Sequence, residues 1–354
     1  MELVQNNPAF KTNNVRTLGE LKVWHAGGAR EAILEPALPI VDPHHHLRDT
    51  VHGRYLLPEL AEDLTSGHDI RATVFIDSQT KHRADGPTLL RPVGETEFVV
   101  QSLAAATTNI NQRRPCAGIV GTLDLTFGAE VRAGLEAHIA AGDGRFRGIR
   151  DPLMWDGSDI NYGVRRPPPD RITDPRFRAG FAELAPLNMT FDAWLFHHQL
   201  PQLTNLARSF PDTTIILNHI GAPLGVGPYA GRREEIFATW RESLVELSRC
   251  RNVVVKLGGL GMLFFGFGFY LRNSPPTSTE LATTWQPYLD VCIEAFGPGR
   301  CMFKSNFPVD IQTCNYATLW NTFKRIAAGY SAAEKAAMFF STANRVYRLG
   351  LTPT

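Results

Sequence analysis

The sequence lacks an excess of charge of either sign, long apolar runs and a leader-like start. It has 36 Lys and Arg against 35 Asp and Glu, a formal net charge of +1. This balance argues against a nucleic-acid-binding protein that works through bulk charge, and against an acidic disordered chain. It has no apolar run of about 18 residues, so we expect no transmembrane helix. The first residues, MELVQNNPAFKTNN, show no basic region followed by an apolar stretch, so we expect no signal peptide.

Paired cysteines are also absent. The five cysteines are scattered and form no CxxC motif, which favours free thiols in a reducing compartment. Hydrophobic residues make up 44% of the 354 residues, enough for a large buried core, so general disorder is excluded. We therefore expect a cytoplasmic globular protein whose partner is a small molecule rather than a nucleic acid or a membrane.

What the sequence does contain is a regular alternation of short apolar runs and longer helical stretches. The predicted strands are Leu38–Val41, Ile70–Ile76, Ala117–Leu123, Phe146–Ile149, Met189–Leu195, Thr214–Leu217, Val253–Leu257 and Cys301–Phe303. This order predicts an α/β protein with parallel strands and right-handed crossovers. Eight units of roughly 33 residues suit a closed (β/α)8 TIM barrel. A doubly wound open sheet is the alternative, and the lack of GxGxxG after the first strand counts against it.

The domain organisation follows from where this alternation begins. Residues 1–37 form an N-terminal extension of mixed polarity, and residues 38–354 form the barrel. Two loops are long, Asp156–Ile172 after the fourth strand and the Gly- and Phe-rich Gly258–Thr279 after the seventh. Loops of this length are usually lids or substrate walls. A core plug or a subunit interface is the alternative for the Phe-rich loop, and this loop and the extension suggest a homodimer.

Histidines follow the first predicted strand in the order Ile40-Val-Asp-Pro-His-His-His-Leu47. Side chains alternate along an extended chain, so His44 and His46 should face one way and His45 the other. Two imidazoles on one face are spaced so that they can coordinate one metal ion. Three histidines in an ordinary turn are the alternative.

Two further predicted strands also run into histidine. His197 follows the fifth strand and His219 follows the sixth. A lone histidine there would usually be structural, but three strand ends with histidine lie at the face where barrel enzymes carry their active sites. The three together predict a functional site.

This pattern resembles the amidohydrolase superfamily, which has HxH after strand one, His after strands five and six, and a GSDWP-like motif after strand eight. The closer likeness is to its amidohydrolase-related (family 2) branch of lactonases and decarboxylases, and it covers about residues 38–348. The resemblance implies a TIM barrel that binds a divalent metal, commonly zinc. By position, His44, His46 and His197 match the metal ligands, and His219 matches the histidine that assists catalysis or orients the substrate.

The strand-eight motif departs from the family pattern, because Asn306 stands where the catalytic Asp usually lies. An amide cannot act as a base. Either another carboxylate takes that role, or the water mechanism is altered or lost. The candidate carboxylates are Asp310, Asp77 and Asp151, with loop capping as the alternative for the last two.

Lys304 is the second departure. By period two it shares a face with Asn306, so it should point into the barrel, where a divalent cation would repel it. Three interpretations stand: a buried ion pair with Asp77 or Asp151, a contact to an anionic substrate group, or a positive charge in place of a metal. Metal-independent lactonases are known in this branch, so a metal-independent mechanism stands beside the zinc one.

Several other side chains are candidate substrate contacts. Arg150 lies where related enzymes often hold a substrate carboxylate, which an arginine fork suits, with surface or inter-helix ion pairing as the alternative. Lys256 lies in an apolar run and needs a partner, either a structural ion pair or the substrate. Trp194, Phe265 and Phe267 suggest an apolar or aromatic substrate wall, with core packing as the alternative.

The expected function is hydrolysis of a lactone or cyclic ester of a small organic acid. A metal, or Lys304 with the arginines, would polarise the carbonyl, and water would attack, oriented by His219 and by a carboxylate such as Asp310 or Asp77. With Asn306, these residues make up the predicted catalytic set. One alternative is non-oxidative decarboxylation of an aromatic or enoic acid. Another is a diverged barrel without hydrolytic activity that has a binding or biosynthetic role.

Overall fold

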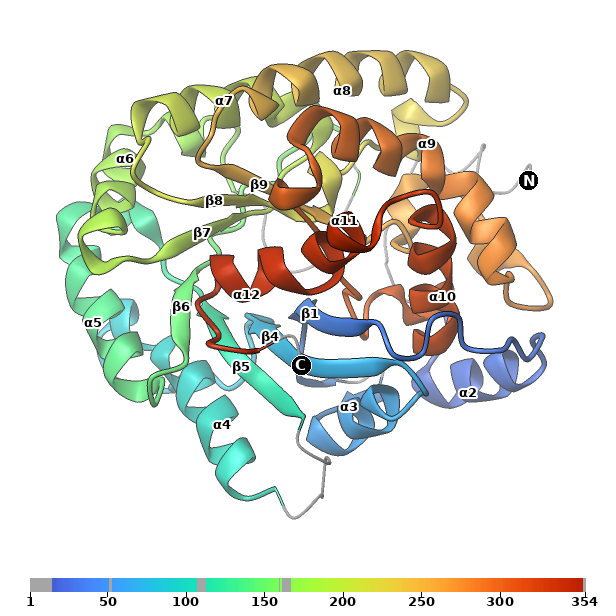
Figure 1. The fold of residues 1–354 in the computed structure, drawn as a ribbon. Helices are drawn as coiled ribbons and strands as arrows, with labels where there is room; N and C mark the ends of the chain where they lie inside the picture. The colour runs from blue at the N-terminus through green and yellow to red at the C-terminus, as the bar shows by residue number, and fades with distance from the viewer. Residues whose placement is uncertain (1–14, 51–52, 107–112, 159, 161–166, 353–354) are drawn as a thin grey trace.

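The computed structural model describes residues 15–50, 53–106, 113–158, 160 and 167–352. Eight parallel strands lie side by side in one sheet, in their order along the chain (Figure 1). They are β1 (Pro39–His45), β4 (Asp69–Ile76), β5 (Arg114–Gly121), β6 (Phe146–Ile149), β7 (Thr190–Ala193), β8 (Ile215–Leu217), β9 (Val253–Leu257) and β10 (Cys301–Phe303). Each predicted strand overlaps one of these, so the predicted strand order is confirmed.

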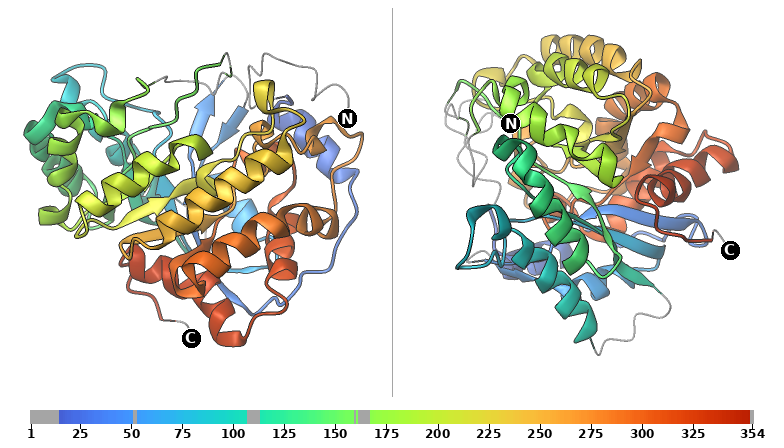
Figure 2. Two further views of the ribbon diagram at one scale, coloured as in Figure 1. Left: turned by 90° about the horizontal axis from the view of Figure 1, so that it is seen from above. Right: turned by 90° about the vertical axis from the view of Figure 1, so that its left-hand side faces the viewer.

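Helices surround this sheet on the outside, as the turned views in Figure 2 show. They are α3 (Leu57–Leu64), α4 (Val93–Ala104), α5 (Val131–Ala141), α6 (Pro175–Ala182), α7 (Leu200–Ser209), α8 (Arg233–Ser248), α9 (Ser278–Phe296), α10 (Tyr316–Ile326), α11 (Ala332–Ala336) and α12 (Thr342–Val346). Side chains cap two of these helices: Asp174 accepts from the backbone N–H of Arg176 at 2.7 Å, and Ser331 forms a capping box with Glu334.

The first and last strands of the sheet meet and nearly close the barrel. The backbone N–H of His46 donates to the carbonyl of Phe307 at 2.8 Å, and that of Asn306 donates to the carbonyl of His44 at 2.9 Å. β1 therefore runs further than predicted, into the histidines, because these backbone groups pair with the segment after β10. The predicted (β/α)8 TIM barrel is confirmed.

The interior of the barrel is apolar at one end and polar at the other. On β9, Val254 belongs to the interior apolar cluster, and two residues later Lys256 is fully buried. After Met302 of β10, which belongs to the same cluster, Lys304 is buried in the same way. Since alternate residues of a strand share a face, the polar groups form a layer towards the carboxyl ends of the strands.

The opposite end of the barrel is closed by the C-terminal part of the chain. Phe340, Val346 and Tyr347 pack in one cluster with Val41 and Val74 of the strands. Figure 1 shows α11 and α12 lying across this end. The carboxyl ends of the strands are therefore the end at which a small molecule can be bound.

The N-terminal extension packs against the barrel. It contains helix α2 (Leu18–Ala26), whose Leu21 and Trp24 are buried. Nζ of Lys324 donates at 2.8 Å to the carbonyls of both Leu34 and Glu35. The boundary at residue 37 stays a prediction.

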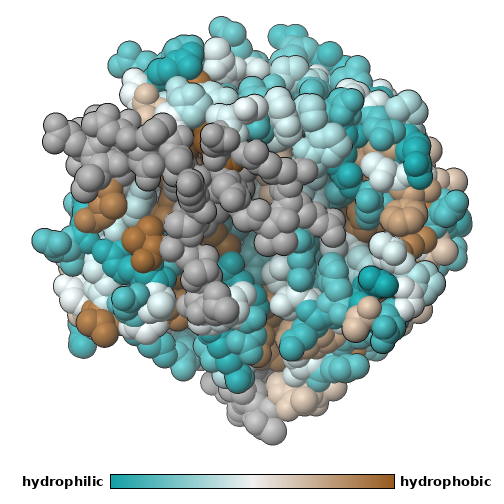
Figure 3. All heavy atoms as spheres, turned by 180° about the vertical axis from the view of Figure 1, so that it is seen from behind, coloured by the Kyte–Doolittle hydropathy of each residue, from teal (hydrophilic) through white to brown (hydrophobic). Residues whose placement is uncertain are grey.

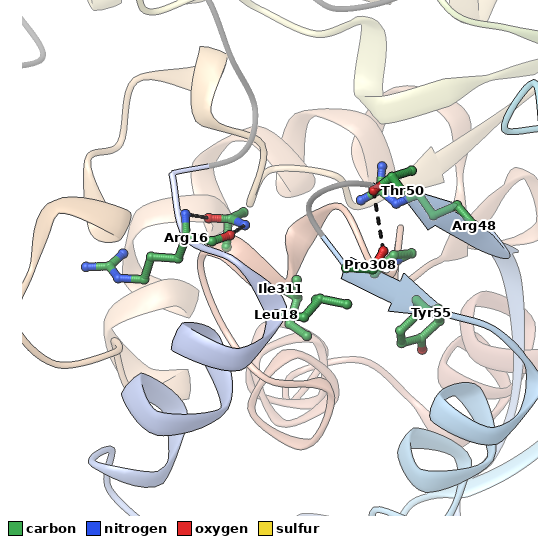
Figure 4. Close-up of a pocket in the computed structure, with 9 residues that line it drawn as sticks. Arg16, Leu18, Arg48, Thr50, Tyr55, Pro308 and Ile311 are labelled. Atoms are coloured by element: carbon green, nitrogen blue, oxygen red, sulfur yellow. Dashed lines mark hydrogen bonds between the residues drawn. The ribbon is translucent and has the colours of Figure 1, made fainter.

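A short antiparallel hairpin, β2 (Arg48–Thr50) and β3 (Gly53–Tyr55), follows β1. Between this hairpin, α2 and the segment after β10 lies a narrow pocket (Figure 4). Its lining residues include Arg16, Leu18, Arg48, Tyr55, Pro308 and Ile311. The pocket shows how closely the extension joins the barrel, because the extension and the core each supply part of its wall.

Among the described residues that Figure 3 shows in colour, hydrophilic side chains predominate and apolar ones lie in small separate patches. The large apolar side chains that are exposed in the described part of the chain are Val15, Val23, Ile139, Val245 and Leu271. The homodimer therefore stays a prediction.

None of the described helices has both the length and the apolarity needed to cross a membrane. All five cysteines are buried free thiols.

Candidate active site

Two of the three consecutive histidines after β1 face each other inside the barrel. Nε2 of His44 lies 3.3 Å from Nε2 of His46, and both rings are buried. His45 points the other way, where its Nε2 lies 2.8 Å from the hydroxyl of Thr73. The predicted alternation is therefore what the structure shows.

His219 lies beside this pair. It belongs to the short turn Asn218–Gly221 after β8 and has a left-handed backbone, with φ of 54°. Its ring centroid lies 5.1 Å from that of His44 and 4.5 Å from that of Trp194. The histidines of the first and sixth strands and the tryptophan after β7 thus meet, as the predicted site requires.

A hydrogen bond joins Nζ of Lys304 to Nδ1 of His219. The position opposite must be glycine, because a Cβ on Gly259 would lie 2.3 Å from Nδ1 of His219 and 2.9 Å from Nζ of Lys304. Gly259 also has φ of +85°, a backbone conformation that residues with a Cβ atom rarely adopt. The Gly-rich start of the strand-seven loop therefore makes room for the pair.

Lys256 contacts His44 and belongs to a second buried polar group. It forms a buried ion pair with Asp192, whose two carboxylate oxygens each accept a hydrogen bond at 3.1 Å from the hydroxyl of Tyr347. Nζ of Lys256 also lies 3.3 Å from Nδ1 of His44. Burial lowers the pKa of Lys256 to about 8, against the opposing effect of Asp192. The structural ion pair is therefore the interpretation of Lys256 that the structure favours.

Sequence reasoning did not single out Asp192 or Tyr347. A signal for Asp192 was available, because it is a lone carboxylate in an apolar strand, two residues before Trp194 and hence on the same face. Tyr347 follows α12, 155 residues further along the chain. Only the closure of the barrel by the C-terminus brings it to the site.

The two arginine–aspartate pairs lie at different places. Nε of Arg150 donates to Asp77 at 2.6 Å, and the positive charge of Arg150 helps to lower the pKa of His46, so this pair borders the histidines. Asp151 accepts from Arg171 at 2.6 Å and from the backbone N–H of Leu125 at 3.1 Å. Asp77 and Asp151 thus each pair with an arginine rather than with Lys304.

Asn306 and Asp310 form a separate hydrogen-bonded pair after β10. Nδ2 of Asn306 donates to Asp310 at 2.6 Å, and the backbone N–H of Gly261 donates to the other carboxylate oxygen at 3.1 Å. Burial raises the pKa of Asp310 to about 6, and the charge of Lys304 opposes this rise. Asp310 is thus the carboxylate whose charge acts most strongly on Lys304, ahead of Asp42.

Burial sets the protonation states of the central groups. The pKa of His219 is lowered well below its ordinary value by burial and then by Lys304, and His44 is affected in the same way. For His46 the causes are burial and then Arg150. Burial also lowers the pKa of Lys304 well below its ordinary value, against the charge of Asp310. At neutral pH the three imidazoles are therefore uncharged.

The site contains buried polar atoms that lack a partner. Both side-chain polar atoms of Asn218, and Oδ1 of Asn306, are buried with no hydrogen-bond partner in the part of the chain that the structure describes. Leaving such a group unpaired costs about 1–3 kcal/mol, so each calls for an explanation. Asn218 directly precedes His219 and was not among the predicted site residues.

His197 lies away from the central pair. Its ring packs against those of His198 and Tyr229, at centroid distances of 5.2 and 5.4 Å, and its Nδ1 accepts from the backbone N–H of Leu224 at 3.4 Å. Burial lowers the pKa of His197 to about 4. Its role as a metal ligand stays a prediction that these contacts do not support.

The predicted aromatic wall is a column of stacked rings, and one end of it lies at the site. Trp194 stacks on Phe264 at 5.6 Å, Phe264 on Phe265 at 5.1 Å, and Phe265 on Phe267 at 6.1 Å. Trp194 is the member of this column that packs against His219. Phe265 and Phe267 therefore lie further from His219 along the column and stabilise the position of Trp194 through Phe264.

The donor set does not fit a three-ligand zinc centre. Within the described residues, no three His, Cys, Asp or Glu side chains are grouped so that they could hold one metal ion. In addition, an ion-paired amine lies where an acceptor would be needed, because Lys256, which is paired with Asp192, faces Nδ1 of His44. A metal-ligating histidine instead donates its other N–H to an acceptor.

Comparisons with known proteins place the chain in a family. A family model described as Amidohydrolase matches residues 41–349. The protein y4mH of Sinorhizobium fredii, described as uncharacterised, is 32% identical over 329 residues, which are 88% of this chain and 99% of that protein. L-fucono-1,5-lactonase of Burkholderia multivorans is 30% identical over 227 residues, covering 60% of this chain and 73% of the lactonase.

A solved structure shows the same fold. An amidohydrolase from Burkholderia multivorans, crystallised with bound zinc, has a TM-score of 0.66 at 24% identity and covers 87% of this chain and 99% of its own. Since the family model spans most of the sequence, and since y4mH aligns along nearly its whole length, the chain belongs to the amidohydrolase family and is a hydrolase of that family.

Proposed function

We propose that this chain hydrolyses the lactone of a sugar acid, which is a cyclic ester of a small organic acid. The observation that carries the proposal is the buried hydrogen bond between Lys304 and His219. The lactonase relative supports the substrate class, because it is named for a lactone of this kind.

The pair can perform the proton transfers that ester hydrolysis needs. In the resting state, the neutral imidazole of His219 carries its single proton on Nδ1 and donates it in a hydrogen bond to the neutral amine of Lys304. Nε2 of His219 then has a free lone pair and can act as a base. Water attacks the carbonyl carbon as Nε2 takes one of its protons, and the Nδ1 proton moves to Nζ. A positive ammonium group therefore forms as negative charge develops on the carbonyl oxygen.

The reverse transfer completes the reaction. As the tetrahedral intermediate collapses, the bond between the carbonyl carbon and the ring oxygen breaks, and that oxygen takes the proton from Nε2 of His219. The proton on Nζ of Lys304 returns to Nδ1, so the pair regains its starting form. The product is the open-chain hydroxy acid.

The surrounding groups suit a substrate rich in hydroxyl groups. Oδ1 of Asn306 is a buried acceptor without a partner in the described part of the chain, and Asn218 offers both a donor and an acceptor. Hydroxyl groups of a sugar lactone can pair with them. Trp194, which packs against His219, supplies an apolar face for the carbon skeleton, and Arg150 adds positive charge.

The carboxylates have positioning roles in this account. Asp310 is hydrogen-bonded to Asn306 and to the backbone of Gly261, and Asp77 is bonded to Arg150. Each is therefore committed to another side chain, and we assign the base to His219. No metal ion enters the proposed steps, because side chains supply the proton transfer and the positive charge.

The test is a substrate panel with protein dialysed against a chelator. Five- and six-membered lactones of aldonic acids are assayed by proton release, and aromatic and enoic carboxylic acids by release of CO₂. Hydrolysis of one or more sugar-acid lactones without release of CO₂ is the expected result. Release of CO₂ from an acid, with every lactone inert, would overturn the proposal in favour of a decarboxylase. If both panels stay inert, the proposal is also wrong.

A further inference from the structure

We propose that Lys256 is a positioning residue that fixes the proton of His44 on Nε2, so that His44 and His46 hydrogen-bond to each other instead of holding a metal ion together. This inference concerns the tautomers of the histidine pair and goes beyond the proposed lactone hydrolysis. It can be tested without a substrate.

The argument begins at Asp192. This carboxylate is fully buried and forms an ion pair with Lys256, whose side chain is equally buried. An amine paired with a buried carboxylate is held as an ammonium group, which has three donors and no acceptor. The hydroxyl of Tyr347 donates to the same carboxylate, so Asp192 is an acceptor on both sides.

The ammonium group fixes the next hydrogen bond. Nζ of Lys256 lies 3.3 Å from Nδ1 of His44, and since the ammonium can only donate, Nδ1 must be an acceptor. The ring of His44 is therefore uncharged, because an imidazolium has a proton on both nitrogens and could not accept at Nδ1. A neutral imidazole with an acceptor at Nδ1 carries its proton on Nε2.

The other end of the chain of hydrogen bonds is fixed by the backbone. Nδ1 of His46 lies 2.9 Å from the carbonyl oxygen of Ile76, which can only accept, so Nδ1 of His46 carries the proton and its Nε2 has a lone pair. The two Nε2 atoms are 3.3 Å apart. The proton of His44 therefore points at the lone pair of His46, and every partner in the chain is satisfied.

A metal ion would need a different arrangement. Both Nε2 lone pairs would have to face the metal, and both Nδ1 atoms would have to donate to acceptors. His46 meets this requirement through Ile76, whereas His44 does not, because Lys256 faces its Nδ1. The HxH spacing is thus that of a metal site, but the amine of Lys256 at Nδ1 of His44 is not the partner that a metal-ligating histidine needs.

The first test uses the native protein. Two-bond ¹H–¹⁵N correlation spectra at pH 7, with signals assigned from His44→Asn and His46→Asn variants, report which nitrogen of each ring is protonated. The expected result is a proton on Nε2 of His44 and on Nδ1 of His46, with neither pattern changed by one equivalent of zinc chloride. A proton on Nδ1 of His44, or zinc-bound patterns for both rings, would overturn the proposal.

The second test exchanges the donor for an acceptor. In Lys256→Gln the amide can donate to Asp192 and accept from Nδ1 of His44, so His44 should move its proton to Nδ1 and free its Nε2. Zinc affinity measured by calorimetry should rise at least tenfold over the native protein. Lys256→Met is the matched control, because it removes the amine without supplying an acceptor.

The control decides the interpretation. If Lys256→Met gains zinc affinity as much as Lys256→Gln, or if neither variant gains any, the proposed role of Lys256 is wrong. If the variants fail to fold, the spectra of the native protein with and without zinc still decide, because they read the tautomers directly.

Discussion

Lys304 and His219 lie 85 residues apart in the sequence and share a hydrogen bond inside the barrel. One residue follows the last strand of the sheet and the other follows the sixth, so the closure of the sheet brings them together. On the family pattern His219 matches the histidine that assists catalysis, whereas Lys304 is a departure from that pattern. Together they can take up and return one proton.

The first prediction concerns the glycine opposite this pair. Gly259→Ala should reduce kcat/KM for lactone hydrolysis by at least 100-fold, because the added Cβ would lie 2.3 Å from Nδ1 of His219. Gly231→Ala is the control, since Gly231 has a similar φ of +77° but nothing within 4 Å of the added atom. Both variants should lose about 1–2 kcal/mol to backbone strain. Equal activities in the two variants would contradict the role given to the pair.

The second prediction concerns the amide in the strand-eight motif. Asn306→Asp should lower the free energy of unfolding at pH 7 by about 1–3 kcal/mol, because Asp310 would lose its 2.6 Å donor and gain a second carboxyl group as neighbour. The double variant Asn306→Asp with Asp310→Asn restores one donor and one acceptor, and should recover most of the loss. Denaturant unfolding measures both. Should the double variant be no more stable than the single one, this hydrogen bond is not what Asn306 supplies.

The third prediction uses an unpartnered amide. Asn218→Leu should raise the free energy of unfolding by about 1–3 kcal/mol, since both polar atoms of Asn218 are buried without partners in the described part of the chain. It should also raise KM for a sugar lactone at least tenfold. Asn252→Leu is the matched control. Its amide donates to the carbonyls of Ala207, Phe210 and Thr213, so that variant should instead be destabilised.

The outcome for Asn218 separates two explanations. A gain in stability with a loss of substrate binding means that the amide is kept for the ligand. A loss of stability comparable to that of the Asn252 variant would mean that Asn218 has a structural role, and the explanation in terms of substrate hydroxyls would be wrong.

The fold could be predicted from the sequence because its signals are local and repeat along the chain. β9 and β10 show this well, since both were predicted within their observed bounds from runs such as Val253–Leu257. The histidine pair was also predictable, because alternation along one strand fixes that His44 and His46 share a face. Each of these inferences needs only residues that are close in the sequence.

The partners inside the site could not be predicted in the same way. Asp77 pairs with Arg150 rather than with Lys304, and Lys304 bonds to a histidine. Several inward-facing charged groups occupy one layer of the barrel, so strand periodicity brings them to the same place without deciding which side chains touch. Those contacts depend on strand stagger and side-chain rotamers, which a sequence pattern does not encode.

The fourth prediction concerns stability at acidic pH. His138 is buried against Phe146, and burial lowers its pKa from 6.5 to about 4. Between these values the unfolded chain binds a proton that the folded protein does not, so folding stability falls as the pH falls. The shift corresponds to a loss of about 3 kcal/mol between pH 7 and pH 4.

The variant His138→Gln tests this effect. The free-energy difference between the native protein and the variant should shrink by about 3 kcal/mol from pH 7 to pH 4, because the other buried histidines titrate in both proteins and cancel. Denaturant unfolding at several pH values gives this difference. If it is the same at every pH, His138 is not the origin of any acid sensitivity.

The most direct test of the central claim is the effect of Lys304→Met and His219→Asn on lactone hydrolysis by protein freed of metal with a chelator. We predict that the native protein keeps its activity after this treatment and that kcat/KM falls at least 100-fold in each variant, in line with about 10²–10⁴-fold for general acid–base catalysis. Lys335→Met, on the surface ion pair with Glu35, should leave kcat/KM unchanged. Loss of native activity on chelation, restored by zinc, or near-native activity of Lys304→Met would contradict the account.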